Sequence, residues 1–195
     1  MPRVSRKEAD QHRVDIIQAA SRLIPQFGID GVSVPALMAE AGLTHGAFYG
    51  HFASKEALVI AACDEAFEKK RKYYDDISVR HANEPDATRA AYIKRYTRAT
   101  HREEVADGCP IAALCGDVAR KERKGPIRAA FVAGVNSLIE RMSLLLSRRK
   151  KKASREEVIA TLSLLVGALQ LSRATEGHAV SDEFLAAARK HLLDA

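Results

Sequence analysis

The chain has little cysteine, no excess of glycine and no shortage of apolar residues. It holds 3 cysteines in 195 residues, too few for a secreted domain stapled by disulfides, and the odd count favours a reducing cytosol. Its 11 glycines exclude a collagen-like chain, and a hydrophobic share of 47% excludes intrinsic disorder. What remains is a globular protein of one domain, or one domain with a small appendage, with enough chain to bury a sizeable core.

Signals for export and for membrane insertion are also lacking. Residues 1–7 contain no apolar stretch of the kind that a secretory signal needs, so we expect no export. The longest uncharged run, Val158 to Ser172, is shorter than the ~20 residues that span a bilayer. We interpret this run as a buried helix and expect a cytoplasmic protein with no membrane partner.

The excess of positive over negative charge lies in one run of the sequence, and it does not by itself mark a nucleic-acid site. The formal net charge is +6, and residues 148–155 hold six basic residues and no acid, so the rest of the chain is neutral. Residues 1–55 are nearly balanced, with six basic and five acidic residues. We interpret the run 148–152 as a solvated loop between helices, because location matters more than total charge.

The apolar pattern predicts an all-α fold. Apolar residues recur at spacings of three and four, and no strict alternation is long enough for a strand. Ser33, Thr44 and Ser54 are expected N-caps, Ser154 opens a capping box, and Gly28 is expected to close the first helix in the left-handed conformation. The helices are expected at about 7–27, 33–42, 44–52, 86–105, 110–121, 126–148, 155–174 and 181–193, with a further long helix that starts at Lys55.

The segment 33–52 has the pattern of a helix-turn-helix. Two short helices, 33–41 and 44–52, are separated by a turn at Gly42. In this arrangement the second helix enters the major groove of DNA. The spacing therefore indicates a DNA-binding element near the N-terminus.

A longer run carries a resemblance to a known family. Residues 37–58 read LMAEAGLTHGAFYGHFASKEAL, and FGIDG precedes them at 27–31. This stretch resembles the N-terminal domain of TetR-type (TetR/AcrR) transcriptional regulators over about residues 10–60. For the remainder of the chain the resemblance concerns the fold alone.

The resemblance implies an N-terminal three-helix helix-turn-helix DNA-binding domain at 10–60. A long helix would join it to a C-terminal helical ligand-binding and dimerisation domain at 61–195. The implied function is that of a sequence-specific dimeric regulator, a repressor on a palindromic double-stranded DNA operator that a small-molecule or electrophile effector releases. No enzymatic activity, cofactor or metal is expected.

The expected DNA contacts lie at helix starts and on the second short helix. Hydroxyls at the helix N-termini suit phosphates, and small residues let the backbone approach base edges. A histidine can donate or accept at a purine edge, so His45 is the expected base reader. Tyr49 and His51 match the family's phosphate-contacting positions. The full set is Ser33, Thr44, His45, Gly46, Ala47, Tyr49, His51 and Lys55, whereas Leu37, Phe48, Phe52 and Leu58 are assigned to a small core.

The last two expected helices are the predicted dimer surface. Residues 158–169 are apolar nearly all round, which implies contacts on two sides, and 184–192 add Phe184, Leu185, Ala188 and Leu192. Two such helices from each subunit would form a four-helix bundle. The alternative is an ordinary core helix of a monomer.

The middle helices are expected to enclose the effector site. Tyr92 and Tyr96 lie four apart on one helical face, and Phe67, Phe131 and Met142 are possible apolar walls. Cys109, between Gly108 and Pro110, is expected at a helix N-terminus, which stabilises a thiolate and raises its reactivity. Cys115 lies six residues further along, on another face of that helix. The alternative for all of these residues is simple packing.

Two rival functions remain open. One is an enzyme with Cys109 as nucleophile and His101 as base, but no phosphate loop, metal-spaced cluster or nucleophile elbow accompanies this pair. The other is an architectural DNA binder without a sensor. The roughly 130 residues beyond the DNA-binding element, a domain's worth of chain, argue against it.

Overall fold

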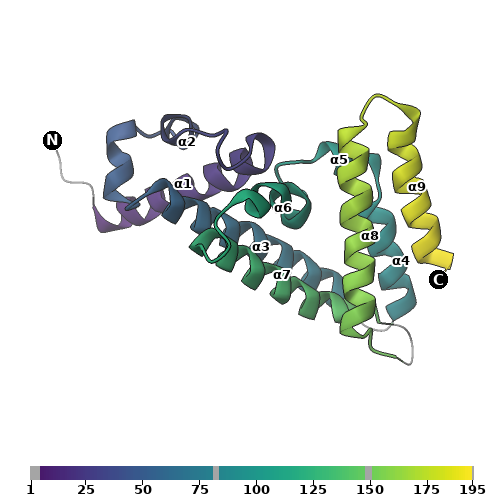
Figure 1. The fold of residues 1–195 in the computed structure, drawn as a ribbon. Coiled ribbons are helices and arrows are strands. Elements are labelled where there is room, and N and C mark those ends of the chain that lie inside the picture. Colours follow the sequence, from purple (N-terminus) through teal and green to yellow (C-terminus); the bar gives the residue numbers. More distant parts are fainter. Residues whose placement is uncertain (1–4, 81–83, 148–150, 195) are drawn as a thin grey trace.

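The computed structural model describes residues 5–80, 84–147 and 151–194, and this part of the chain is built of helices, as predicted (Figure 1). The expectations for residues 1–4, for Asn83 and for the basic residues 148–150 lie outside the described residues. The elements are α1 (Arg6–Phe27), α2 (Val34–Glu40), the 3₁₀ helix η1 (His45–Gly50), α3 (Lys55–Arg80), α4 (Pro85–Tyr96), α5 (Ala99–Glu103), α6 (Pro110–Arg120), α7 (Pro126–Leu145), α8 (Arg155–Ala174) and α9 (Ala179–Asp194).

The molecule is elongated, with its first and last helices at opposite ends (Figure 1). We call α1, α2 and η1 the head. The long helix α3 runs from the head along α7 toward the far end, where α8 and α9 pack against each other. Helix α6 lies between the head and α8 and contacts α1, α3, α7 and α8. A change at α6 is therefore placed to affect both ends.

Serine side chains begin several helices. Ser33 Oγ accepts the amide of Ala36 at 3.3 Å, and Ser54 Oγ accepts the amide of Ala57 at 3.1 Å. Ser154 forms the predicted capping box with Glu157, and Ser5 forms another with Glu8 at the start of α1. These local bonds explain why the starts of α2, α3 and α8 follow closely from the sequence.

The helix predicted over 86–105 is two helices. It breaks after Tyr96, where the buried Thr97 donates its hydroxyl to the carbonyl oxygen of Ile93 at 2.8 Å. Arg189 of α9 donates its Nε to Thr97 Oγ1 at 2.9 Å and also donates to the Thr97 carbonyl. A tertiary partner thus takes the carbonyl at the helix end, which local periodicity could not reveal.

Helix α3 begins at Lys55 as predicted and runs to Arg80; Tyr74 on it is buried, and Asp75 forms an ion pair with Arg141 of α7. Two other boundaries differ from the prediction. Helix α7 ends at Leu145 instead of 148. Gly28 ends α1 with φ 81° and ψ 162°, so its positive φ was expected but its extended ψ is not that of a left-handed cap. The amide of Ile29 then donates to Asp117 of α6.

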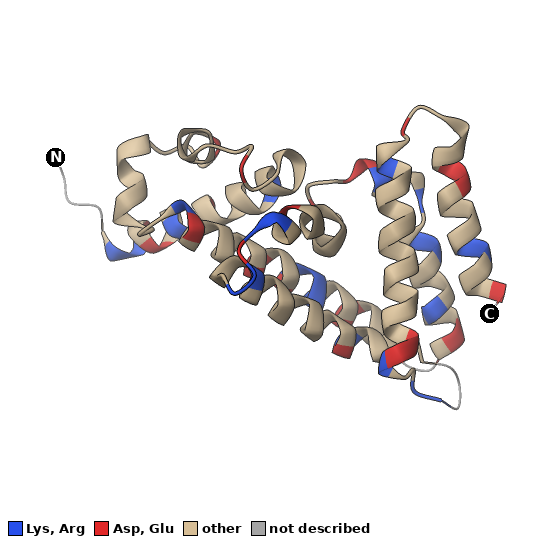
Figure 2. Cartoon of the chain, viewed as in Figure 1, with Lys and Arg blue, Asp and Glu red and all other residues tan. Residues whose placement is uncertain are grey.

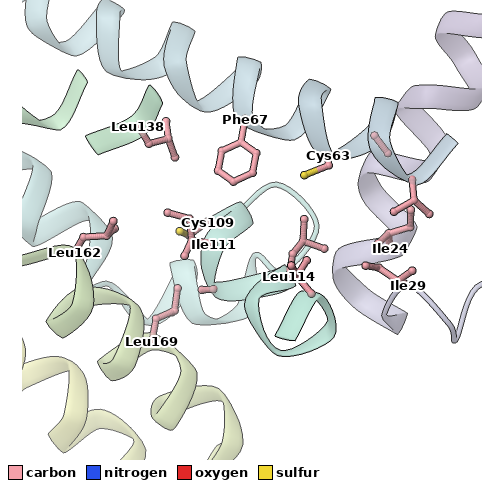
Figure 3. Packing of buried hydrophobic residues seen from close by; sticks show 14 of the residues in the cluster. Ile24, Ile29, Cys63, Phe67, Cys109, Ile111, Leu114, Leu138, Leu162 and Leu169 are labelled. Atoms are coloured by element: carbon pink, nitrogen blue, oxygen red, sulfur yellow. The ribbon is translucent and has the colours of Figure 1, made fainter. Parts of the chain in front are cut away.

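The buried core is continuous from the head to α8. In the head, Leu37, Phe48, Phe52 and Leu58 are buried together, as predicted. Leu114 of α6 lies beside Ile24 and Ile29 of the head region, while Ile111 and Leu169 lie further along (Figure 3). By length and composition alone, α8 is the one described helix that could cross a membrane, and 33% of its apolar window is buried in the protein.

Candidate DNA-binding head and ligand cavity

The turn between α2 and η1 is fixed by backbone hydrogen bonds around Gly42. The amide of Leu43 donates to the Met38 carbonyl at 2.9 Å, and the amide of Gly42 donates to the Ala39 carbonyl at 3.0 Å. This pair is a Schellman motif, and it needs the left-handed φ of 71° that Gly42 adopts. The glycine therefore sets the angle at which η1 leaves α2.

The second short helix begins directly after Thr44, its N-cap residue as predicted, but it is a 3₁₀ helix and not an α-helix. The amide of Ala47 donates to the Thr44 carbonyl at 3.1 Å, and the amide of His51 donates to the Phe48 carbonyl at 2.9 Å. Thr44 makes no side-chain capping bond. With glycine at positions 46 and 50, the segment lacks the propensity for longer α-helical pairing.

The outer face of η1 is exposed. His45, Gly46 and Tyr49 are all exposed, and Tyr49 reaches 70%. The Tyr49 ring meets Phe48 edge-on at 5.2 Å between centroids and lies 6.5 Å from the His45 ring. The buried Phe48 thus anchors an exposed pair of polar rings, His45 and Tyr49. Ser33 and Thr44 are exposed as well.

Three of the predicted contact residues are half-buried. Ala47 packs against the core, and Lys55 stands at the first turn of α3. The ring of His51 meets the ring of His12 edge-on, with 6.0 Å between centroids. Burial, followed by the charges of His12 and Arg13, lowers the pKa of His51. At neutral pH its ring is therefore a neutral hydrogen-bonding group.

Arg13 is a structural residue of the head that sequence reasoning missed. Its guanidinium donates to the His51 carbonyl at 2.7 Å and lies 4.2 Å from the centroid of the Phe52 ring. It thereby ties α1 to the end of η1. Arg13 and Phe52 are far apart in the sequence and share no local pattern, so no signal pointed to this contact.

Helix η1 itself carries no Lys, Arg, Asp or Glu. Figure 2 shows η1 without coloured residues, and Glu40 is the charged residue of α2. Its carboxylate pairs with Arg22 of α1 at 3.0 Å. A Cβ built at Gly46 would meet no atom within 4 Å. The packing of the head therefore does not require glycine at 46, which leaves open space in front of the η1 backbone.

A cavity of about 290 Å³ lies between α1, α3, α4, α5 and the start of α6. Tyr92, Tyr96 and Cys109 line it, as expected of an effector site. Cys115 lies elsewhere, and its Sγ accepts a hydrogen bond from Gln170 at 3.3 Å. The walls predicted from Phe67, Phe131 and Met142 are wrong, because the fully buried Phe67 and Met142 belong to the core and Phe131 packs on Phe67.

The aromatic wall of the cavity is buried and neutral. Tyr74 and Tyr92 share a hydrogen bond of 3.0 Å between their hydroxyls. Burial raises the pKa of Tyr74, Tyr92 and Tyr96 well above that of a free phenol. Burial also lowers the pKa of His101 to about 4, and its Nδ1 lies 2.7 Å from the Tyr96 carbonyl oxygen. The His101 ring is therefore neutral and donates its Nδ1 proton to that oxygen.

Cys109 is the N-cap residue of α6 and is 2% exposed, so a ligand reaches it through the cavity. It makes no capping bond with its side chain. Cys63 is different, because burial raises the pKa of its thiol to about 12 and keeps it protonated. Of the three cysteines, Cys109 is the one that lines the cavity.

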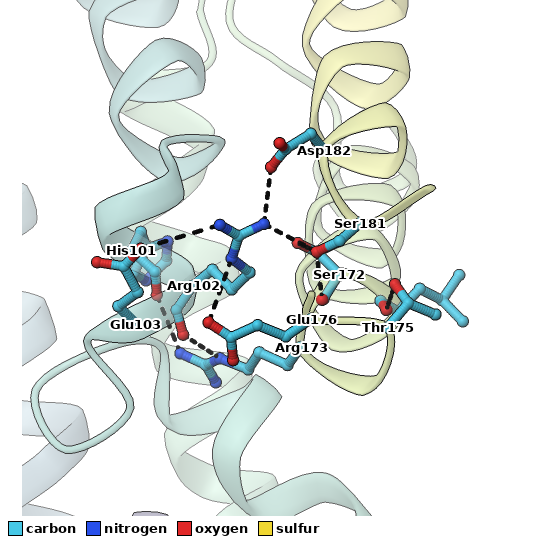
Figure 4. Close-up of polar contacts among 10 residues, drawn as sticks. His101, Arg102, Glu103, Ser172, Arg173, Thr175, Glu176, Ser181 and Asp182 are labelled. Atoms are coloured by element: carbon cyan, nitrogen blue, oxygen red, sulfur yellow. Dashed lines mark hydrogen bonds and ion pairs between the residues drawn. The ribbon is translucent and has the colours of Figure 1, made fainter. Parts of the chain in front are cut away.

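A cluster of hydrogen bonds and ion pairs joins α5, which lines the cavity, to α8 and α9. Arg102 of α5 donates to Ser181 Oγ at 2.8 Å and to Asp182 Oδ1 at 2.7 Å on α9 (Figure 4). Arg173 of α8 donates to the Arg102 carbonyl at 2.9 Å (Figure 4). One side of the cavity is thereby attached to α8 and α9.

The opposite side is attached to the head through α6. The amide of Ile29 donates to Asp117 Oδ2 at 2.7 Å, and Lys121 pairs with Asp30 at 2.6 Å. The Lys121 bond lowers the pKa of the Asp30 carboxyl. Helix α6 therefore begins at Cys109 in the cavity wall and ends against the segment that follows α1.

Helices α8 and α9 are apolar on more than their inner side. Val158, Leu165 and Leu169 are buried, whereas Ile159 and Leu171 of α8 and Val180 of α9 are exposed. These three exposed aliphatic side chains lie on the helix pair that the sequence predicts as the dimer surface.

Comparison with known proteins agrees with this arrangement. The family model described as "Bacterial regulatory proteins, tetR family" matches residues 16–62, which include α2, η1 and most of α1. The regulator YerO of Bacillus subtilis is 41% identical over 49 residues, 25% of this chain and 17% of that protein. The repressor AcnR of Corynebacterium diphtheriae is 35% identical over 65 residues, 33% of this chain and 34% of that protein. The matches thus span one third or less of this chain and about a third or less of those relatives.

The likeness in fold covers nearly the whole chain. A TetR transcriptional regulator from Chloroflexus aurantiacus superposes with a TM-score of 0.72 at 26% identity, over 96% of this chain and 95% of that one. A head with an exposed η1, joined by a long helix to a helical body, defines the class of helix-turn-helix DNA-binding regulators. Within that class, residues 16–62 match the family model of the TetR family of bacterial regulatory proteins, and the overall fold is that of a TetR transcriptional regulator. The proteins compared are described as transcriptional regulators or repressors, in line with the expectation that this chain is not an enzyme.

Proposed function

We propose that the protein is a repressor that binds a palindromic operator in double-stranded DNA as a homodimer and is released by an effector in the cavity. Residues 10–60 form the DNA-binding domain of this proposal and residues 61–195 the effector-binding and dimerisation domain. The observation that carries it is the exposed face of η1, with the rings of His45 and Tyr49 side by side on a fully buried Phe48. Exposed polar rings held by a buried side chain are suited to contacts in the major groove of DNA.

The contact residues are assigned roles by their exposure and bonding. His45 reads a base edge, and Gly46 with Ala47 lets the η1 backbone approach the groove. Thr44 is exposed and its hydroxyl is free of capping, so it can donate to a phosphate oxygen. Tyr49, His51, Lys55 and the N-terminus of α2 at Ser33 contact the phosphate backbone in the same way.

Pairing through α8 and α9 would double the binding site. Ile159, Leu171 and Val180 are exposed on these helices, at the end of the molecule away from the head (Figure 1). A symmetric dimer of this kind presents two heads to half-sites about one helical turn of DNA apart. Cytoplasmic location follows from this function.

The effector would act through α6, which joins the cavity to the head. A ligand that binds one conformation of the cavity better than another shifts the spacing of the two heads. An electrophile that alkylates Cys109 in the cavity wall would act at the same place. Addition of the Cys109 thiol to an activated double bond would form an Sγ–C bond at the expense of the π bond, and a proton would end on the carbon beside the activating carbonyl.

The test is fluorescence anisotropy on DNA from beside the gene, at several salt concentrations. We expect saturable binding that exceeds binding to random DNA and weakens as salt rises. His45→Ala should change the preference among sequences, whereas Tyr49→Phe and Lys55→Ala should weaken binding to all sequences and flatten the salt dependence. An unchanged sequence preference in His45→Ala would remove the base-reading role from His45.

Thiol chemistry is tested in the same assay. Reduced protein is treated with N-ethylmaleimide, and Cys109→Ser serves as the control. Loss of DNA binding in the native protein but not in Cys109→Ser would support electrophile sensing. Equal behaviour of the two would leave non-covalent ligands as the effectors.

A further inference from the structure

The cavity wall carries more positive than negative groups. Lys69, Lys70, Arg95 and Arg98 line it, against the carboxylates of Glu104 and Asp107. Both carboxylate residues are exposed, so water solvates their charges, whereas Lys70 is half-buried. Charge that is partly withdrawn from water gains most from a partner of opposite sign.

Lys70 has little compensation within the protein. Its Nζ donates to the main-chain carbonyl of Asp107 at 3.2 Å, and among the described residues no carboxylate lies within ion-pair distance of it. The Nζ also lies 5.4 Å from the centroid of the Tyr73 ring, and the Arg95 guanidinium lies 5.2 Å from the same centroid. Two cations therefore share one ring at the cavity wall. Burial lowers the pKa of Lys70, which reflects this incomplete solvation.

The aromatic wall offers a second, independent feature. The side chain of Tyr96 is 5% exposed, and its hydroxyl has no oxygen or nitrogen partner among the described residues; the Cys109 thiol is its polar neighbour. A buried hydroxyl without a partner costs free energy, which a ligand oxygen would recover. The rings of Tyr92 and Tyr96 lie 6.0 Å apart and form a surface on which a flat ring can pack.

The charge and the size of the cavity together limit the chemical class of ligand that it can bind. A cationic ligand would be repelled by Lys70 and Arg95, and a purely apolar ligand would offer neither cation an opposite charge and the Tyr96 hydroxyl no hydrogen bond. Ligand pockets span about 300–1,000 Å³, so a cavity of about 290 Å³ suits a molecule of one or two rings.

We propose that the cavity binds a flat aromatic carboxylate, with the carboxylate on Lys70 and Arg95 and the ring against Tyr92 and Tyr96. This inference rests on the proposed function, because it names the chemical class of the effector. Lys70 fixes the charge of the ligand, and Tyr96 favours an oxygen substituent near its hydroxyl.

The test is isothermal titration calorimetry of the full chain without DNA, with 2-naphthoate and its neutral isostere 2-naphthamide as probes. A charge-assisted bond to Lys70 should make the carboxylate bind at least about tenfold more tightly than the amide. Lys70→Met should abolish that preference and leave amide binding unchanged, while Lys70→Arg should retain it. Lys72→Met is the matched control, since Lys72 is on the same helix, 74% exposed and 3.8 Å from Glu68.

Thermal unfolding of each variant confirms that it is folded. Equal affinity for carboxylate and amide, equal loss of both in Lys70→Met, or no binding of either probe would overturn the inference. DNA binding is measured separately by anisotropy. Failure there, with the carboxylate preference intact, would count against the repressor and leave the ligand class standing.

Discussion

The head and the cavity region use buried side chains in opposite ways. In the head, Phe48 and Leu37 are fully buried and apolar, and the polar rings of His45 and Tyr49 lie outside. Around the cavity, Tyr92, Tyr96 and the thiol of Cys109 are themselves buried, with the cations of Lys70 and Arg95 beside them. The first arrangement presents a fixed surface to a partner outside. The second leaves polar groups inside that a small partner can complete.

The largest expected effect comes from emptying the core of the head. Phe48→Ala should lower the free energy of unfolding by about 3–5 kcal/mol, because it removes a buried aromatic ring and leaves a void. Urea unfolding followed by circular dichroism measures this. Tyr49→Ala, next in the chain and 70% exposed, is the control and should change stability little. Similar losses in the two variants would contradict the view that Phe48 is the anchor and Tyr49 the contact.

The buried histidine of the cavity region should make the stability of the protein depend on pH. Burial lowers the pKa of His101 to about 4 in the folded protein, against an ordinary value of 6.5. The unfolded chain therefore binds more protons between these values, and the folded protein loses stability as the pH falls from about 6.5 to about 4. The loss should be on the order of 2 kcal/mol.

The measurement is a series of urea titrations between pH 7 and pH 4. His101→Gln should flatten the dependence, whereas His191→Gln, at an exposed histidine of α9, should not. His51 adds a contribution of the same sign from the head, since its pKa is also lowered by burial. A slope that disappears in His51→Gln instead of His101→Gln would place the main titrating group in the head.

An added methyl group at a glycine should have different effects in the body of the molecule and in the head. A Cβ at Gly134 of α7 would overlap the buried ring of Phe67, so Gly134→Ala should cost about 1–3 kcal/mol of stability through overpacking. A Cβ at Gly46 of η1 meets nothing within 4 Å, so Gly46→Ala should not lower stability. It should instead weaken binding to DNA. Thermal unfolding and anisotropy on the same two proteins test both statements.

Much of this contrast was predictable from the sequence, and what escaped prediction has physical reasons. Caps such as Ser33 and Ser154 are local, so the helix starts followed from the chain. The small core of the head also followed, because Phe48 and Phe52 lie within one short pattern.

Contacts between distant segments could not be predicted. Arg189 donates to the Thr97 carbonyl at the point where a helix ends that the apolar pattern predicted to continue. Arg13 packs on the ring of Phe52, which is distant in the sequence. The cavity walls were only partly identified, since Tyr92, Tyr96 and Cys109 line it but Cys115 does not. Periodicity tells which face of a helix is apolar, not which apolar face meets a cavity.

The smallest expected effect concerns the joint between the two regions, at Asp117. Its carboxylate accepts the amide of Ile29 at 2.7 Å, directly after Gly28, which has a positive φ. Asp117→Ala leaves that partly buried amide without its partner and should cost about 1 kcal/mol, while Asp117→Asn keeps an acceptor oxygen.

The sharper readout is hydrogen exchange at the Ile29 amide. Its exchange should accelerate in Asp117→Ala and stay slow in Asp117→Asn, whereas amides inside α2 should be unchanged in both. Helix α6 follows directly on Cys109 in the cavity wall and carries Asp117 near its other end. A movement of α6 caused by a ligand in the cavity would therefore reach the head through this bond. Unchanged exchange at Ile29 in Asp117→Ala would contradict the view that this bond joins α6 to the head.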